Sequence, residues 1–322
     1  MIESHARSDA ATPAPLRDPQ RAAASLQRSI DRLAARRGIP HLVVAVERGD
    51  GSFRWRGAAG VADGAGTPMR SDTPFFIASI TKLLIAAAAM KLAEQQRLDI
   101  DRSIAAYLPR ATVQGLHRIG GIDRSESITL RHLMSHTSGL PDWLEDSPAD
   151  GRSVVDELLR DGDRYWTREQ MLQRVRQQLH AHFPPQPLQA ARARARYSNT
   201  NYQLLIASIE AATGLPIHDV LHEQLFAPLR MHDTWHPAHP PARIDRPVIA
   251  PAALWAGDRV LHAPLMLQSL EDYYSTTTDL LRLLRALTCG ALFANPRTWP
   301  AMCARWIRFS LPRDRAALRS PS

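Results

Sequence analysis

Residues 75–90, FFIASITKLLIAAAAM, form an apolar stretch interrupted by one lysine, Lys82, three residues after Ser79. Alanine and leucine are strong helix formers, so the stretch predicts a helix over residues 81–96. The chain carries 40 lysines and arginines, yet lysine occurs only at Lys82 and Lys91. A chain that otherwise uses arginine therefore places one of its two lysines inside an apolar helix, which calls for a chemical reason.

The spacing of Ser79 and Lys82 supplies such a reason. Residues three apart lie on neighbouring positions of one helix face, so the lysine amine can reach the serine hydroxyl. A serine needs a base to become a good nucleophile, and a lysine in apolar surroundings gives up its proton more readily than in water. Arginine cannot do this, because its guanidinium stays protonated in proteins. The alternative is a serine cap followed by a surface lysine, with Lys91 on the opposite side of the helix as the solvated one.

A second candidate element is Tyr197-Ser198-Asn199, just before another predicted helix. A phenol flanked by cations can serve as a general base. An asparagine amide can orient either a lysine or an amide-bearing substrate. The structural alternative is a tyrosine at the end of a strand, followed by Asn199 as a helix cap.

These elements resemble the Ser-x-x-Lys and Tyr-Ser-Asn motifs of the class C β-lactamase, DD-peptidase and esterase family of serine hydrolases. The resemblance runs from about residue 25 to about residue 290. Residues 128–143, ITLRHLMSHTSGLPDW, are similar to the family's His-Thr-Ser-Gly loop. Residues 273–287, YYSTTTDLLRLLRAL, resemble its late Ser-Thr-x-x-Asp-Leu helix.

The resemblance implies an α/β (α+β) fold of the β-lactamase/DD-peptidase type, with an antiparallel sheet flanked by helices and a large helical region. It implies that Ser79 attacks a carbonyl carbon to form an acyl-enzyme, with Lys82 and Tyr197 sharing the general-base work. Asn199 would orient Lys82 or the substrate, and the backbone N–H of Ser79 would form half of an oxyanion hole. No metal or organic cofactor is implied. The expected substrate is a small ester, amide or β-lactam.

The remaining pattern predicts one domain over residues 19–322 after a flexible leader, residues 1–18. Residues 19–75 are expected to hold a helix over 21–38 and a hairpin whose turn is residues 48–51. Residues 76–290 are expected to be mainly helical, with helices in 154–161, 168–182, 199–216, 217–229 and 275–290. Residues 291–322 do not follow the family pattern.

One family element is absent from this sequence. Members carry Lys or His followed by Thr or Ser and then Gly on an edge strand, which supplies the second oxyanion N–H. No lysine follows Lys91, no glycine follows Gly290, and the His-Thr-Ser-Gly run at 136–139 comes too early. The chain is either shortened at its C-terminus or a divergent member, and shortening is favoured because the pattern holds to Gly290 and then stops. The expected consequences are an open edge on the hairpin, weak turnover and low stability.

Composition limits the other functional classes. The chain has 322 residues, 44% of them hydrophobic, and a net charge of +8. A basic composition invites a nucleic-acid interpretation, but the basic residues are scattered, so no nucleic-acid partner is expected. The two cysteines, Cys289 and Cys303, are interpreted as buried or half-buried free thiols. The polar leader and the lack of an uncharged apolar run predict a cytoplasmic protein with no membrane partner.

Two further clusters are weaker. Five histidines are expected to be ordinary surface side chains rather than metal ligands: His218, His222, His232, His236 and His239. Arg192, Arg194 and Arg196 share one face of an extended strand, where they either assist Tyr197 and favour an acidic substrate or are merely solvated. The main hypothesis is therefore a serine hydrolase acting on a small molecule. The rival is a catalytically silent binding or scaffold protein of the same fold, and the oligomeric state is left open.

Overall fold

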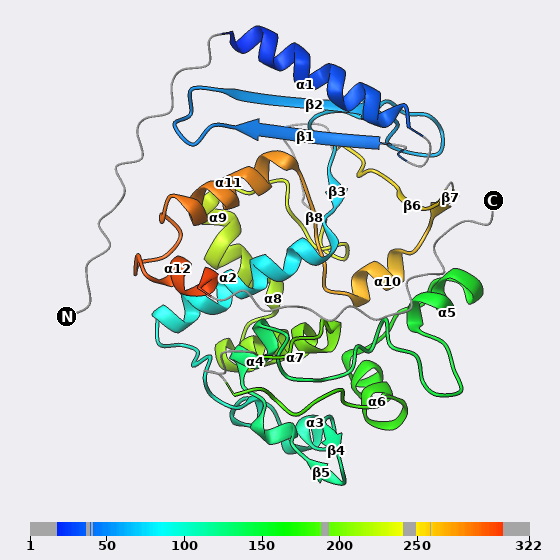
Figure 1. Cartoon of the computed structure of the whole chain (residues 1–322), viewed down its shortest axis with the longest axis vertical. Helices are drawn as coiled ribbons and strands as arrows, with labels where there is room; N and C mark the ends of the chain where they lie inside the picture. The colour runs from blue at the N-terminus through cyan, green and yellow to red at the C-terminus, as the bar shows by residue number, and fades with distance from the viewer. Residues whose placement is uncertain are drawn as a thin grey trace. The chain divides into compact units, whose positions relative to one another are not determined.

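The computed structural model describes residues 18–36, 39, 41–187, 193–240, 249–257 and 259–304 (Figure 1). The chain divides into two compact units, each described here by itself. Unit 1 comprises residues 1–73 and 249–260, and unit 2 comprises residues 74–248 and 261–322. Of the predicted leader only Asp18 is described, and residues 305–322 lie outside the described part.

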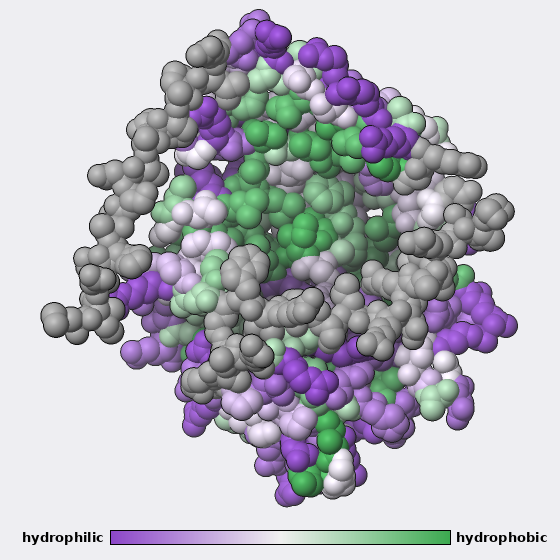
Figure 2. Space-filling model, viewed as in Figure 1, coloured by the Kyte–Doolittle hydropathy of each residue, from purple (hydrophilic) through white to green (hydrophobic). Residues whose placement is uncertain are grey.

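The helix of unit 1 is fastened to its hairpin. α1 (Pro19–Ala34) begins after Asp18, whose carboxylate accepts the N–H of Arg21 and so satisfies a donor that the helix leaves unpaired. Hydrophilic side chains run along the exposed side of α1 (Figure 2). On its other side Gln27 Nε2 donates to the carbonyl oxygen of Ala58 in the hairpin over 3.0 Å.

The predicted hairpin is confirmed. β1 (His41–Glu47) and β2 (Arg54–Gly60) pair antiparallel, with His41 opposite Gly60 and Glu47 opposite Arg54. In the described part of the chain this sheet has two strands. A short pair, β6 (Leu254–Ala256) and β7 (Arg259–Leu261), is formed by a segment that the sequence placed in the helical region.

Unit 2 is mainly helical, as predicted, and its described residues form two short strand pairs rather than one broad sheet. β3 (Phe75–Phe76) pairs antiparallel with β8 (Tyr274–Ser275), and β4 (Arg118–Ile119) pairs with β5 (Ile122–Asp123). The fold class, a combination of helices with small antiparallel sheets, is therefore confirmed. The helical segments are η1 (Ala78–Ile80), α2 (Thr81–Glu94), η2 (Ile104–Ala106), α3 (Arg110–Val113), η3 (Ser125–Ser127), α4 (Leu130–Met134), α5 (Val154–Asp161), α6 (Arg168–Gln178), α7 (Asn199–Thr213), α8 (Ile217–Leu221), η4 (His222–Phe226), α9 (Ala227–Leu229), α10 (Pro264–Ser269), α11 (Thr277–Thr288) and α12 (Thr298–Cys303).

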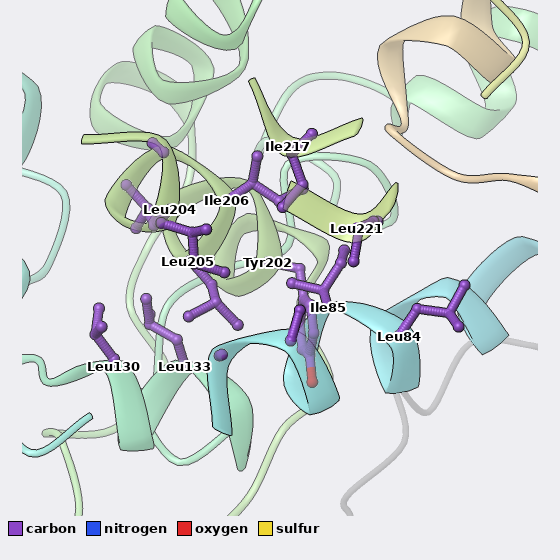
Figure 3. Packing of buried hydrophobic residues seen from close by; sticks show 14 of the residues in the cluster. Leu84, Ile85, Leu130, Leu133, Tyr202, Leu204, Leu205, Ile206, Ile217 and Leu221 are labelled. Atoms are coloured by element: carbon purple, nitrogen blue, oxygen red, sulfur yellow. The ribbon is translucent and has the colours of Figure 1, made fainter. Parts of the chain in front are cut away.

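The core of unit 2 lies around α2 and α7. Every residue of α7 from Asn199 to Ile209 is buried, and the polar ones among them have hydrogen-bond partners, for example Asn201 with His136 and Ser208 with the carbonyl oxygen of Leu204. Leu204, Leu205 and Ile206 of α7 lie among side chains of α2, α4 and α8, and Tyr202 lies beside Ile85 of α2 (Figure 3). This central packing fixes where α2 and the start of α7 meet.

The helix predicted over residues 217–229 is interrupted. Its middle, η4, is a π-helical segment between α8 and α9. Within η4 the carbonyl oxygen of Gln224 accepts a hydrogen bond from Lys91 Nζ over 2.8 Å. The expectation of a solvated Lys91 is therefore wrong: its side chain is half-buried against η4, and this burial lowers its pKa.

The expected thiol burial is also wrong. Cys289 and Cys303 are both free and both exposed, since they follow or end the short helices at the surface of unit 2. Local sequence carries little information on thiol exposure, because the burial of a helix end depends on which other segments cover it.

In the described residues no single helix is both long enough and apolar enough to cross a membrane. The pair Asn199–Thr213 and Ile217–Leu229 meets the length and composition criteria together, with a bend of 80° between its parts. Its first helix is the core helix α7.

Gly139 lies where no other residue fits. Its φ is +76°, and a Cβ there would lie 1.8 Å from the carbonyl oxygen of Phe183. We expect Gly139→Ala to lower the free energy of unfolding by more than about 2 kcal/mol, because backbone strain and a backbone clash add. Urea unfolding followed by circular dichroism measures this. Gly214→Ala is the matched control, since Gly214 has a φ of +72° with open space around it; an equal loss in both variants would contradict the clash.

Candidate active site

Ser79 lies in a tight turn held from one side by a distant segment. Tyr273 accepts the N–H of Ile77 through its carbonyl oxygen over 2.9 Å and donates its own N–H to Thr81 Oγ1 over 3.1 Å. Ala78, directly before Ser79, has a φ of +45°, a left-handed conformation that costs energy in a non-glycine residue. Such strain next to an exposed serine is typical of a residue whose position matters for function.

Ser79, Lys82 and Tyr197 meet at one point. Ser79 Oγ lies 2.5 Å from Tyr197 Oη, and Lys82 Nζ donates to Ser79 Oγ over 3.2 Å. Lys82 Nζ also lies 5.3 Å from the centre of the Tyr197 ring and 5.6 Å from that of Tyr202. Lys82 is 9% exposed whereas Ser79 is exposed, so the amine is enclosed and the hydroxyl faces solvent. Two motifs 118 residues apart are thus brought into hydrogen-bond distance.

Asn199 is held by a carboxylate. Its amide nitrogen donates to both carboxylate oxygens of Asp142, over 3.2 and 3.0 Å. No hydrogen bond joins Asn199 to Lys82 in the part of the chain that the structure describes. The Asp142 carboxylate fixes the orientation of the Asn199 amide, so this asparagine is a rigid part of the site wall.

The backbone N–H of Ser79 is available to a ligand. It donates to no acceptor among the described residues, while the next N–H along the chain, that of Ile80, donates to the carbonyl oxygen of Ile77. The role of this N–H as one oxyanion donor stays a prediction.

A model of the Beta-lactamase family matches residues 26–305. The chain belongs to the beta-lactamase family. This beta-lactamase-family protein is 30% identical to esterase EstB of Burkholderia gladioli, in an alignment that covers 92% of this chain and 75% of the esterase. It is 28% identical to penicillin-binding protein 4* of Bacillus subtilis, over 55% of this chain and 34% of that protein.

Solved structures agree with the family assignment. A D-stereospecific amidohydrolase from Streptomyces sp. is similar with a TM-score of 0.63 at 25% identity, covering 86% of this chain and 76% of its own. The D-amino acid amidase of Ochrobactrum anthropi SV3 gives 0.64 at 26% identity, covering 86% and 72%. The family and these relatives identify the chain as a hydrolase.

The sequence did not single out Asp142 or His136, which both contact the predicted site residues. The Asp142 carboxylate accepts the hydrogen bonds of the Asn199 amide. The His136 ring stacks on Tyr197 with ring centres 4.6 Å apart. Both residues lie in the loop that carries the His-Thr-Ser-Gly run. A lone aspartate directly after a Leu-Pro pair is a weak signal by itself, because its partner is 57 residues away.

The arginines before Tyr197 are engaged elsewhere. Arg196 forms an ion pair with Asp146 over 2.6 Å, and the Arg194 guanidinium lies 4.6 Å from the centre of the Phe183 ring. Arg192 lies outside the described residues. Arg196 is therefore neither merely solvated nor in contact with Tyr197 through its guanidinium, and a preference for an acidic substrate stays a prediction.

The histidine cluster differs from expectation at His236, and His218 is half-buried. His236 is buried, with its Nε2 3.5 Å from a carboxylate oxygen of Glu271, and burial lowers the pKa of His236 to about 4. The interpretation of His236 as a surface residue is therefore wrong, whereas His222, His232 and His239 are exposed. No group of three or more possible metal ligands occurs among the described residues.

The pH dependence of stability should reveal the buried carboxyl of Asp142. Burial raises its pKa from 3.8 to about 6, so the folded state binds this proton more tightly than the unfolded state. The stability that protonation provides is present below pH 4 and is lost as the pH rises to 6. The native chain therefore loses stability between pH 4 and pH 7, and Asp142→Asn does not. We expect the free energy of unfolding of Asp142→Asn to rise by about 3 kcal/mol relative to that of the native chain over this range. Urea unfolding at both pH values measures this, and Asp150→Asn, an exposed aspartate, controls for net charge; a flat difference for Asp142→Asn would contradict the buried charge.

Proposed function

We propose that this beta-lactamase-family hydrolase acts through an acyl-enzyme on Ser79, and that its substrates are small esters or amides. The observation that carries the proposal is the meeting of Ser79 Oγ with Tyr197 Oη at 2.5 Å and with Lys82 Nζ at 3.2 Å. The Ser79 hydroxyl is hydrogen-bonded to a phenol and to an amine, and either group can take its proton when it is deprotonated. A serine nucleophile needs such a base.

In the first step Ser79 Oγ attacks the carbonyl carbon of the substrate. The hydroxyl proton of Ser79 passes to Tyr197 or Lys82, whichever of the two is deprotonated. The carbonyl oxygen becomes an oxyanion, for which the N–H of Ser79 is one donor. The intermediate then collapses, and the bond to the leaving alcohol or amine breaks as that group takes up the proton. A water molecule repeats the sequence on the acyl-enzyme and releases the acid, restoring Ser79.

The substrate class rests on the named relatives. One is an esterase, and others are a D-amino acid amidase and a D-stereospecific amidohydrolase, so ester and amide bonds are the first to test. A penicillin-binding protein is also among the relatives, which makes a β-lactam the second class to test. The cytoplasmic location that favours small esters and amides over peptidoglycan stays a prediction.

The rival function is a silent scaffold of the same fold. A scaffold has no need of an exposed serine whose hydroxyl lies 2.5 Å from a phenol and 3.2 Å from an enclosed amine. This geometry therefore favours the enzyme. The strained φ of +45° at Ala78 points the same way.

The proposal is tested by intact mass after incubation with a fluorophosphonate and, separately, with a penicillin. Cys289 and Cys303 are exposed thiols, so a probe selective for activated hydroxyls is needed. We expect one adduct on the native chain and none on Ser79→Ala, which keeps both thiols. A well-folded native chain without an adduct, or an adduct that survives in Ser79→Ala, would contradict the proposal. A penicillin adduct would add β-lactams to the substrate class.

A further inference from the structure

His136 occupies an unusual place beside Tyr197. Its φ is +55°, a conformation that a histidine rarely adopts, and its carbonyl oxygen accepts the N–H of Arg196 over 3.0 Å. This hydrogen bond joins the backbone of the 136–142 loop to Arg196, the residue directly before Tyr197. The strain is maintained by contacts of the His136 side chain with the same segment.

The ring of His136 is held by two donors on one nitrogen. Nδ1 accepts the N–H of Ser198 over 3.2 Å and a hydrogen of the Asn201 amide over 3.0 Å. Asn201 is oriented in turn, because its carbonyl oxygen accepts the hydroxyl of Ser138 over 2.6 Å. An Nδ1 that accepts carries no proton, so the ring is the neutral Nε2–H tautomer. Burial and the charge of Lys82 lower the pKa of His136 to about 3, which keeps the ring neutral at ordinary pH.

The plane of the fixed ring lies against the phenol. The ring centres of His136 and Tyr197 are 4.6 Å apart with 25° between their planes, and Tyr202 lies on the ring at 5.3 Å. Tyr197 Oη has Ser79 Oγ as its hydrogen-bond partner at 2.5 Å. One hydrogen bond leaves the phenol ring free to turn about it, and the stacked imidazole limits that rotation.

We infer that His136 is a positioning residue for Tyr197: its neutral ring, fixed through Ser198 and Asn201, holds the phenol at hydrogen-bond distance from Ser79. This inference rests on the proposed function, in which Tyr197 shares the general-base work. It adds a role that depends on the shape and hydrogen bonding of the imidazole and not on proton transfer by it.

Two variants distinguish the contribution of the stacked His136 ring from that of its acceptor nitrogen, Nδ1. His136→Asn keeps an acceptor oxygen near the place of Nδ1 and tolerates a positive φ, but it removes the stack. His136→Phe keeps the stack and removes the acceptor, leaving the N–H of Ser198 and the Asn201 amide without that partner. We expect His136→Asn to lower kcat by about 10-fold or more with KM within twofold, because a misplaced base affects the chemical step. His136→Phe is expected to keep more of kcat and to melt at a lower temperature.

The decisive measurement is a double-mutant cycle with Tyr197→Phe, which lacks the phenol hydroxyl that His136 is inferred to position. We expect the kcat loss caused by His136→Asn to fall below about twofold in the Tyr197→Phe background, because the two residues act as one unit. A structural histidine would lower kcat by the same factor in both backgrounds, and that result would overturn the inference. His117→Asn, which changes another buried histidine, is the matched control and is expected to act equally in both backgrounds.

Two further outcomes are assigned in advance. If His136→Asn does not fold, Asn201→Ala takes its place in the cycle, since it removes one of the two donors to the imidazole while keeping the ring; equal factors in both backgrounds would again overturn the inference. Labelling of Ser79 and the effect of Tyr197→Phe alone are measured first. A failure of either contradicts the proposed function itself, and equal factors in the cycle contradict only the role of His136.

Discussion

Ser79→Ala is expected to lower kcat/KM for a small ester by about 10³-fold or more while leaving the melting temperature within a few degrees of the native value. The exposed Ser79 hydroxyl contacts Lys82 and Tyr197, and its removal deletes the nucleophile without opening a cavity in the core. Steady-state kinetics with a chromogenic ester measures the loss. Initial rates at several enzyme concentrations separate the residual rate from hydrolysis by the buffer.

A matched serine controls for the loss of a hydroxyl. Ser127 is likewise exposed in a short 3-10 turn, η3, where its hydroxyl donates to the carbonyl oxygen of Arg124 over 2.7 Å. Ser127→Ala is expected to keep kcat/KM within about twofold, since a surface change of this kind rarely alters a distant site. If Ser79→Ala kept more than a tenth of the native kcat/KM, another group would be the nucleophile.

Lys82→Arg is expected to lower kcat by about 10²-fold or more, although the charge is conserved. The guanidinium cannot give up its proton, so it cannot take one from Ser79. It is also larger than the amine, and Lys82 is enclosed between the rings of Tyr197 and Tyr202. Measurement of the adduct-formation rate with the fluorophosphonate reports the first step alone and should fall by a similar factor.

The second lysine provides the control for this change. Lys91 lies on the same helix, α2, nine residues further on, and is also partly buried, with its amine on the Gln224 carbonyl oxygen. Lys91→Arg is expected to keep kcat within about threefold, because nothing places its amine near Ser79. Comparable losses in the two variants would show that arginine is simply not tolerated in α2, and the base assignment of Lys82 would fall.

The nucleophile turn could be predicted because its information is local. Ser79 in η1 and Lys82 in the first turn of α2 are three residues apart in continuous helical turns, so this short spacing brings the hydroxyl and the amine together. Tyr197 was predicted from a second motif, and in the structure its hydroxyl lies within hydrogen-bond distance of Ser79 Oγ. The hairpin and the major helices follow from periodicity and turn residues in the same way.

What the sequence did not predict depends on tertiary packing. The Asp142 carboxylate and the His136 ring contact Asn199 and Tyr197 only because the 136–142 loop folds against the start of α7. The half-buried state of Lys91 arises from the η4 segment, 133 residues away. Helical periodicity gives the side of a helix on which a residue lies, but not which segment covers that side.

The complete burial of the first part of α7 has a consequence for how this enzyme can change. α7 begins at Asn199, two residues after Tyr197, and is also the central helix of the core. A substitution there alters substrate handling and folding stability together, so adaptation to a new substrate is expected to avoid it. Ile80, 44% exposed and adjacent to the nucleophile, is free of that constraint. We expect substitutions at Ile80 to lower folding stability less than substitutions in the first part of α7.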